Sequence, residues 1–200
     1  AVISARYAKH VAQAHGTTVE VWHLPEHAVN VDQVAQAALT SIATLSARLG
    51  PMPDALLRIV ELPRWSGFGA FALRGMVLFP EHRGFLLDER AGGVDLLLRR
   101  VAHEVGHQWW GHSVEPPQAE GSLLLVESLA KDAEQAVVQS VHGAAGVDAI
   151  LAYDEDRYLV GRADAGGDDP ALERLTDEPW LYYGKGSLMM HAVRAAVGDS

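Results

Sequence analysis

The sequence contains no cysteine, no long apolar run and no surplus of basic charge. Without cysteine the chain forms neither disulfides nor thiolate metal sites, so any bound metal must use histidine and carboxylate ligands. The densest apolar run, residues 123–126, is far shorter than the ~18–20 residues that span a bilayer. The 16 Lys and Arg against 26 Asp and Glu give a net charge of −10, and no basic stripe offsets it, which excludes a nucleic-acid partner.

The remaining composition is that of an ordinary globular domain. Apolar residue types make up 48% of the chain and charged types 21%, and 200 residues are enough to bury one hydrophobic core. We therefore expect a single soluble domain. The first residue is Ala rather than Met, and the last expected helix stops at the end of the chain, so we expect a fragment of a longer protein. The one unusual count is that of the 10 histidines.

Hydrophobic periodicity and turn residues predict an α+β chain with two lobes. Strands are expected at residues 18–24, 56–62, 76–79 and 85–87, with an irregular edge at 65–75. Helices are expected at 31–49 (capped by Asn30), 94–111, 122–141, 147–159 and 185–197. The sequence thus predicts one domain in which residues 1–91 form a small mixed-sheet lobe and residues 92–200 a helical lobe, with a site in the cleft between them.

The most specific motif is His103-Glu104-Val105-Gly106-His107, an H-E-x-x-H sequence expected about 0.03 times by chance at this composition. On a helix the two histidines lie about 6 Å apart along the axis and about 40° apart around it, so both imidazoles can reach one ion. Apolar residues of the same helix cluster on its opposite side, which leaves the histidine pair free to face a cleft. The glutamate between them could then take a proton from a water molecule and deliver it to a leaving amine.

Glu127 is the candidate third ligand. It lies in an otherwise apolar helical stretch, where an unpaired buried carboxylate would cost several kcal/mol, so its position calls for a partner. Two His and one Glu with an open fourth position form a known catalytic arrangement for one Zn²⁺ ion. The alternative metzincin pattern fails, because Trp110 and Ser113 stand where it needs Gly and His. His112 would point away from the metal face, in a surface or supporting role.

The segment from His103 to Gly111, followed by Glu127, resembles the gluzincin aminopeptidases related to membrane alanyl aminopeptidase and leukotriene hydrolase. Most of that family places 18 residues between the second His and the Glu, whereas this chain has 19. This spacing and the residues around Glu127 look most like a bacterial subgroup whose peptidase domain is fused to an ABC-transporter-type membrane permease. The resemblance covers residues 4–199 and implies a thermolysin-like catalytic domain.

Two further positions of this family can be compared with the chain. Tyr183-Gly184-Lys185-Gly186 matches the family's Tyr before a Lys-Gly pair, and the hydroxyl of this Tyr would stabilise the oxyanion. The neighbouring Tyr182 is not expected to have this role. The family also uses a Gly-x-Met-Glu-Asn segment whose Glu binds the α-amine of the substrate. The corresponding residues 78–82 keep only that glutamate, Glu81, without the Gly, Met or Asn. The resemblance therefore implies Glu81 as the carboxylate that pairs with the substrate's ammonium group.

Together, these features imply a zinc-dependent aminopeptidase acting on peptides with a free N-terminus, in which His103, His107 and Glu127 bind one Zn²⁺ and Glu104 is the general base. Two alternatives stay open: a thermolysin-like endopeptidase with the same zinc set, and a non-catalytic transporter-associated domain that binds zinc or peptide. The family's flanking domains are missing here, and a permease could attach the full-length protein to the bacterial inner membrane. Glu134 could orient a zinc-bound histidine or be a solvated charge. Localisation, oligomeric state and side-chain specificity stay open.

Overall fold

The computed structural model describes residues 3–14, 16–67, 69–88, 94–167, 169–172 and 178–198. Its strands and helices, in chain order, are β1 (Ala8–Ala14), β2 (Thr17–His23), α1 (Val31–Leu49), β3 (Leu56–Leu62), β4 (Phe71–Leu73), β5 (Met76–Pro80), α2 (Leu96–Gly106), α3 (Leu129–Asp164) and α4 (Gly186–Val197). Short 3-10 turns lie at Pro25–His27, Arg64–Ser66 and Glu81–Arg83, and π-helical turns at Leu124–Ser128 and Trp180–Lys185. This mixture of helix and sheet is compatible with the predicted α+β class.

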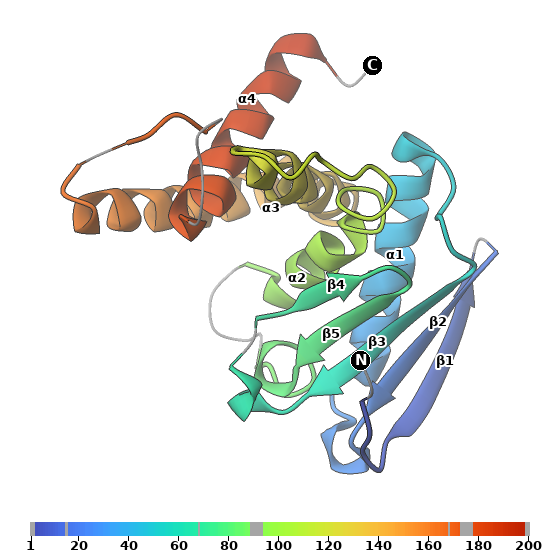
Figure 1. The fold of residues 1–200 in the computed structure, drawn as a ribbon. Helices are drawn as coiled ribbons and strands as arrows, with labels where there is room; N and C mark the ends of the chain where they lie inside the picture. Colours follow the sequence, from blue (N-terminus) through green and yellow to red (C-terminus); the bar gives the residue numbers. More distant parts are fainter. Residues whose placement is uncertain are drawn as a thin grey trace.

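The strands form one mixed sheet in the order β1-β2-β3-β5-β4. Its three inner strands β2, β3 and β5 run parallel, and β1 and β4 are antiparallel edges. Buried and half-buried residues alternate along β2, because successive side chains of a strand point to opposite faces of the sheet. Helix α1 connects β2 to β3 and packs against the sheet (Figure 1).

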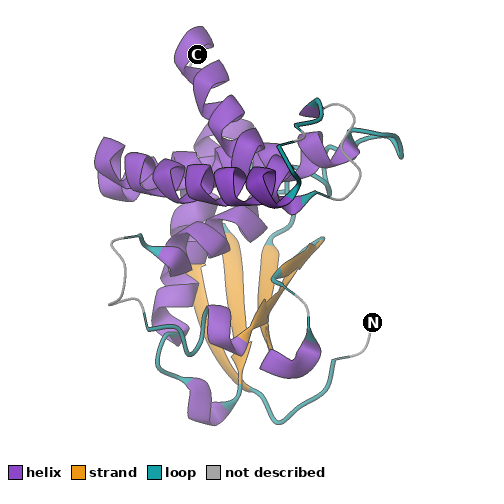
Figure 2. Ribbon diagram, turned by 90° about the vertical axis from the view of Figure 1, so that its left-hand side faces the viewer, coloured by secondary structure: helices purple, strands orange, loops and turns teal. Residues whose placement is uncertain are grey.

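Helices α2, α3 and α4 lie together at one end of the sheet (Figure 2). One hydrophobic cluster joins the two regions: it contains Val21 from β2 and Ile42 from α1 as well as Val101 from α2 and Val137 from α3. Helix α2 is therefore fixed between the sheet region and α3. The expected lobe boundary at residues 91 and 92 lies outside the described residues. Within them, no helix combines the length and the apolar character needed to cross a membrane.

One local prediction is wrong, and another, Asn30 as the N-cap residue of α1, is right in position only, because tertiary contacts use the groups concerned. Residues 85–87 form a turn rather than a strand: the Leu86 N–H donates to the Glu81 carbonyl (2.8 Å) and the Leu87 N–H to the Gly84 carbonyl (3.2 Å). Asn30 precedes α1 but does not cap it with its side chain. Its amide nitrogen donates instead to the carbonyl oxygens of Gly84 and Leu87, both at 2.8 Å, and holds this turn against the start of α1.

The bounds of the later helices also differ from the prediction. Helix α2 ends at Gly106, five residues before the expected position, and His107 is its C-cap residue. The two helices expected at 122–141 and 147–159 correspond to the two halves of α3, which meet at the non-helical residue Gly143. The backbone of Gly143 has φ 65°, which glycine adopts without the steric cost of a side chain. The expected break therefore exists as a change of direction, without an intervening loop.

Candidate metal centre

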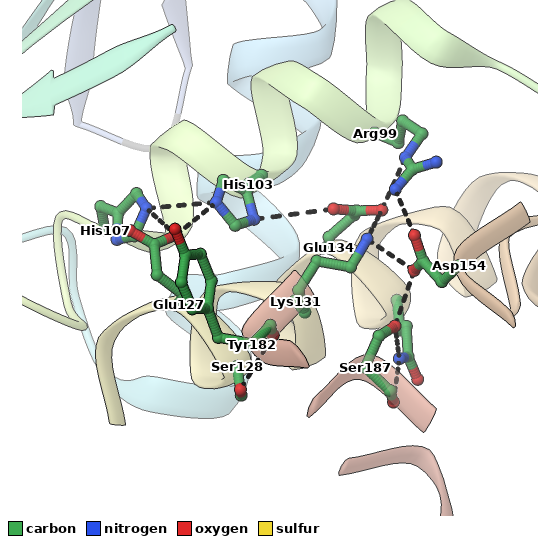
Figure 3. Close-up of polar contacts among 11 residues, drawn as sticks. Arg99, His103, His107, Glu127, Ser128, Lys131, Glu134, Asp154, Tyr182 and Ser187 are labelled. Atoms are coloured by element: carbon green, nitrogen blue, oxygen red, sulfur yellow. Dashed lines mark hydrogen bonds and ion pairs between the residues drawn. The ribbon is translucent and has the colours of Figure 1, made fainter. Parts of the chain in front are cut away.

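Three side chains of the helical region point at one another (Figure 3). His103 comes from α2, His107 from its C-cap position, and Glu127 from the π turn before α3. The Nε2 atom of His103 lies 3.1 Å from Glu127 Oε2 and 3.2 Å from His107 Nε2. The Nε2 atom of His107 lies 3.5 Å from the same carboxylate oxygen. The three donor atoms thus form a nearly equilateral triangle.

This triangle has the dimensions of a zinc site. Zinc binds histidine nitrogen and carboxylate oxygen at about 2.0–2.2 Å, so tetrahedral geometry separates its donors by about 3.3–3.5 Å. The observed separations of 3.1, 3.2 and 3.5 Å agree with that range to within a few tenths of an ångström. When both rings are neutral with the proton on Nδ1, the two Nε2 atoms and the carboxylate oxygen all carry lone pairs that face one another without a proton between them. A metal cation accepts all three lone pairs. The residues present therefore fit a zinc ion.

Each histidine has an oxygen acceptor behind its ring. His107 Nδ1 donates to the Trp110 carbonyl oxygen at 3.1 Å, which leaves Nε2 of the neutral ring unprotonated toward the triangle. His103 Nδ1 is buried without a hydrogen bond and lies 3.6 Å from Glu134 Oε2. Glu134 is only 2% exposed, so its reading as a solvated charge is wrong. Its position behind His103 is the one that an orienting carboxylate takes at a metal site.

The local electrostatics keep Glu127 anionic. Burial favours the neutral carboxyl, but hydrogen bonds and charges from His103 and His107 outweigh it and hold the pKa of Glu127 well below its usual range. For His107, burial opposes the charged ring, while Glu127 and Glu104 raise its pKa above the ordinary value. Burial raises the pKa of the Glu104 carboxyl, and the charges of both histidines oppose that effect. The site thus contains an anionic carboxylate, Glu127, and next to it a buried carboxyl group, Glu104, whose protonated form is favoured by burial.

Gly106 lets the two ligand-bearing segments approach closely. A Cβ atom at this position would lie 3.0 Å from the Cβ of Ala133 and 3.6 Å from the Cα of Ala130, so α2 and α3 pack almost backbone to backbone. The π turn that carries Glu127 leads directly into α3. The glycine inside the H-E-x-x-H motif therefore helps to bring Glu127 within reach of both histidines.

A cavity of about 230 Å³ borders His103, Glu104 and Tyr183. The Tyr183 ring meets the His103 ring edge to face, with 5.5 Å between the centroids. Burial raises the pKa of the Tyr183 hydroxyl, and the Glu127 carboxylate raises it further, so this hydroxyl stays a hydrogen-bond donor. Tyr182 is buried in an apolar cluster with Leu181, and Tyr183 packs against the same cluster. The two tyrosine rings meet edge to face, with 4.6 Å between their centroids, and of the two only Tyr183 is among the residues that line the cavity.

Glu81 does not join this group. It is not among the residues that line the cavity, and its carboxylate accepts a hydrogen bond from the Arg64 backbone N–H at 3.0 Å. Its other oxygen lies 3.9 Å from Nδ1 of His27, which is paired with the buried Glu61. His112 donates to a backbone carbonyl of β4 at 3.2 Å and is no ligand of the triangle. The amine-binding role of Glu81 stays a prediction, whereas the other five proposed site residues lie together.

A buried charge network that the sequence did not indicate lies behind the candidate metal centre (Figure 3). Arg99 donates to Glu134 at 2.8 Å and to Asp154 at 3.0 Å, and the Lys131 ammonium group lies 2.6 and 2.7 Å from the same two carboxylates. Ser187 donates to Asp154 at 2.7 Å. This network ties α2, both halves of α3, and α4 together. Its only local sequence signal is the spacing of Lys131 and Glu134, three residues apart on one helix, because Arg99 and Asp154 lie far from them along the chain.

Comparisons with known proteins assign no family. No protein-family model matches the chain, and no curated protein matches its sequence. What the protein does must therefore be inferred from the triangle of donors, the cavity and the residues around them.

Proposed function

We propose that this chain carries the catalytic site of a zinc-dependent peptidase. The observation that carries the proposal is the convergence of His103, His107 and Glu127 within 3.5 Å, next to a cavity bordered by Glu104 and Tyr183. A metal site with a purely structural role has no use for a carboxyl group and a hydroxyl group at its open side. A hydrolytic site can use the carboxyl group as proton acceptor and the hydroxyl group as oxyanion donor.

His103, His107 and Glu127 would hold the ion. When bound, Zn²⁺ makes a water molecule more acidic and polarises the scissile carbonyl group. Glu104 accepts the proton of the attacking water at its carboxylate and later donates it to the leaving amine. The Tyr183 hydroxyl donates a hydrogen bond to the carbonyl oxygen as negative charge develops on it.

The finer assignment is an aminopeptidase, as the resemblance to the gluzincin aminopeptidases implies. In that case Glu81 binds the free α-amine, and the full-length protein includes flanking domains and a membrane permease. The contacts of Glu81 with His27 and Arg64, outside the cavity, favour a second candidate, a thermolysin-like endopeptidase that has the same zinc set and no amine anchor. The two candidates differ in whether a blocked N-terminus is tolerated.

The test compares the zinc-loaded chain with its Glu104→Gln variant on one fluorogenic peptide, offered with a free and with an acetylated N-terminus. Glu104→Gln should keep its zinc and lose about 10²–10⁴-fold in kcat, because it removes only the proton transfer. Glu155→Gln, an exposed position on α3, is the matched control and should behave like the parent chain.

The outcomes separate the candidates. Cleavage of the free peptide alone supports the aminopeptidase, and equal cleavage of both peptides supports the endopeptidase and excludes Glu81 as an amine anchor. Equal rates for the parent chain and Glu104→Gln, or no hydrolysis by the zinc-loaded parent, would refute the peptidase.

A further inference from the structure

The cavity beside the candidate metal centre is lined by many cations. Its wall of 13 residues includes Arg83, Arg99, Arg100, Lys131 and Arg157. These are five of only 16 Lys and Arg in a chain whose net charge is −10. The net charge of the whole chain repels anions, so the overall composition does not account for a cluster of cations in one cavity. The cluster therefore indicates a role of the cavity itself.

Two of the five cations are neutralised inside the protein. Arg99 and Lys131 belong to the buried charge network, in which the two anions Glu134 and Asp154 balance them. Two of the others, Arg83 and Arg157, share the cavity wall with one further carboxylate, that of Glu104. The wall therefore keeps a positive excess, and a metal ion at the neighbouring triangle would add to it.

Arg83 and Arg157 are placed to meet a ligand. The guanidinium group of Arg157 lies over the Tyr183 ring, 4.6 Å from its centroid, and this stacking leaves the N–H donors at its edge available. Arg100 donates to the backbone carbonyl of Arg83 at 3.1 Å and so ties the turn after β5 to α2. In the part of the chain that the structure describes, neither Arg83 nor Arg157 is paired with a carboxylate, and both side chains are exposed.

We propose that this cavity is a carboxylate-binding subsite, which gives the peptidase a preference for substrates with a carboxylate near the cleaved bond. The inference rests on the proposed function, since a peptide held at His103 and Glu104 is what brings its neighbouring groups to these arginines. Guanidinium groups bind carboxylates through paired, charge-assisted hydrogen bonds that are about twice as strong as neutral ones. The same arginines would repel a Lys or Arg side chain at that position. The carboxylate can come from an acidic side chain or from the C-terminus of a short peptide.

Binding measured without turnover tests the subsite independently of catalysis. The zinc-loaded Glu104→Gln chain is titrated calorimetrically with amidated tetrapeptides of alanine in which each position in turn is replaced by Glu or Gln. Tetra-alanine with a free C-terminus and with an amidated one completes the set. We expect at least one carboxylate peptide to bind about tenfold more tightly than its neutral partner, with a ratio that falls as salt is added.

Substitutions then assign this preference to the cavity. Arg83→Gln and Arg157→Gln, each made in the Glu104→Gln chain, should reduce the ratio severalfold, and the two together should bring it close to 1. Arg74→Gln is the matched control, because Arg74 is an exposed arginine paired with Asp54 outside this cavity. Circular dichroism of each variant verifies that the fold is retained.

Each outcome decides one point. A preference within the amidated series identifies an acidic side chain as the ligand, and a preference for the free C-terminus identifies the terminal carboxylate. Equal binding of every carboxylate peptide and its neutral partner would overturn the subsite, as would a preference that survives the double substitution. Hydrolysis without a carboxylate preference would support the peptidase and overturn the subsite. A carboxylate preference without hydrolysis by the parent chain would support the subsite and overturn the peptidase.

Discussion

Replacing Asp154 by asparagine removes one of the two anions of the buried charge network. Asp154 is 0% exposed, and its carboxylate is within 3.0 Å of Arg99, 2.7 Å of Lys131 and 2.7 Å of the Ser187 hydroxyl. Asparagine has nearly the same size and shape, so packing is preserved and the substitution isolates the charge. Arg99 and Lys131 are then left with the single carboxylate of Glu134.

The structure sets the size of the effect. Removing one partner from a buried ion pair costs about 3–5 kcal/mol, because it leaves a buried charge uncompensated. We expect Asp154→Asn to lower the free energy of unfolding by about 3 kcal/mol, a large part of the roughly 5–15 kcal/mol that stabilises a typical domain. Adding Lys131→Met to Asp154→Asn makes the numbers of buried cations and anions equal again, because Arg99 is then paired with Glu134 alone. The double variant should therefore be more stable than the sum of the single effects by more than about 1 kcal/mol.

Urea unfolding followed by circular dichroism measures these free energies. Asp156→Asn is the matched control, because Asp156 is an exposed aspartate on the same helix, and it should change stability by less than about 0.5 kcal/mol. A loss below about 1 kcal/mol for Asp154→Asn, or strict additivity in the double variant, would refute the assignment of Asp154 to a balanced buried network.

Tyr183→Phe should lower kcat by about 10²–10³-fold at unchanged zinc content, because it removes the proposed oxyanion donor and leaves all three proposed zinc ligands in place. Tyr182 does not line the cavity, so Tyr182→Phe should lower kcat far less; the opposite ranking of the two variants would exclude Tyr183 as the oxyanion donor. The hydrogen bond to Glu61 raises the pKa of His27 above its ordinary value of 6.5. The charged pair thus stabilises the fold below about pH 6.5 and is lost as the pH rises through the raised pKa. His27→Gln should cost about 1–2 kcal/mol at about pH 5.5 and much less at about pH 9 in urea unfolding, and a pH-independent loss would contradict this assignment.

Local pattern predicted the elements whose ends are marked by glycine or proline. Helix α1 ends at Leu49, as predicted, because Gly50 adopts φ 92° and Pro51 follows it. Strand β3 has the predicted bounds 56–62, and Pro63 ends it. Local pattern failed where an apolar segment is buried without pairing in the sheet. Phe85 is completely buried, with its ring 6.3 Å from that of Phe79, yet its neighbours form a turn, and apolar composition does not distinguish this case from a strand.

The motif spacing indicated the residues of the candidate metal centre but not how they meet. Glu127 lies in a π turn, which holds more residues than an α-helical turn and so changes the direction of the side chains that follow. A uniform helical periodicity cannot place such a residue. The cationic cavity had no local signal, because Arg83 and Arg157 come together only when the turn after β5 and the second half of α3 border the same space.

The zinc content of the purified chain tests the central claim most directly. After incubation with excess zinc and removal of free metal, elemental analysis should find one zinc ion per parent chain and per His10→Ala control chain, since His10 lies on β1, where it pairs with the exposed Asp32. The same analysis should find no stoichiometric zinc in His103→Ala, which lacks one of the three donors. A parent chain without stoichiometric zinc, or a His103→Ala chain that retains it, would contradict the account.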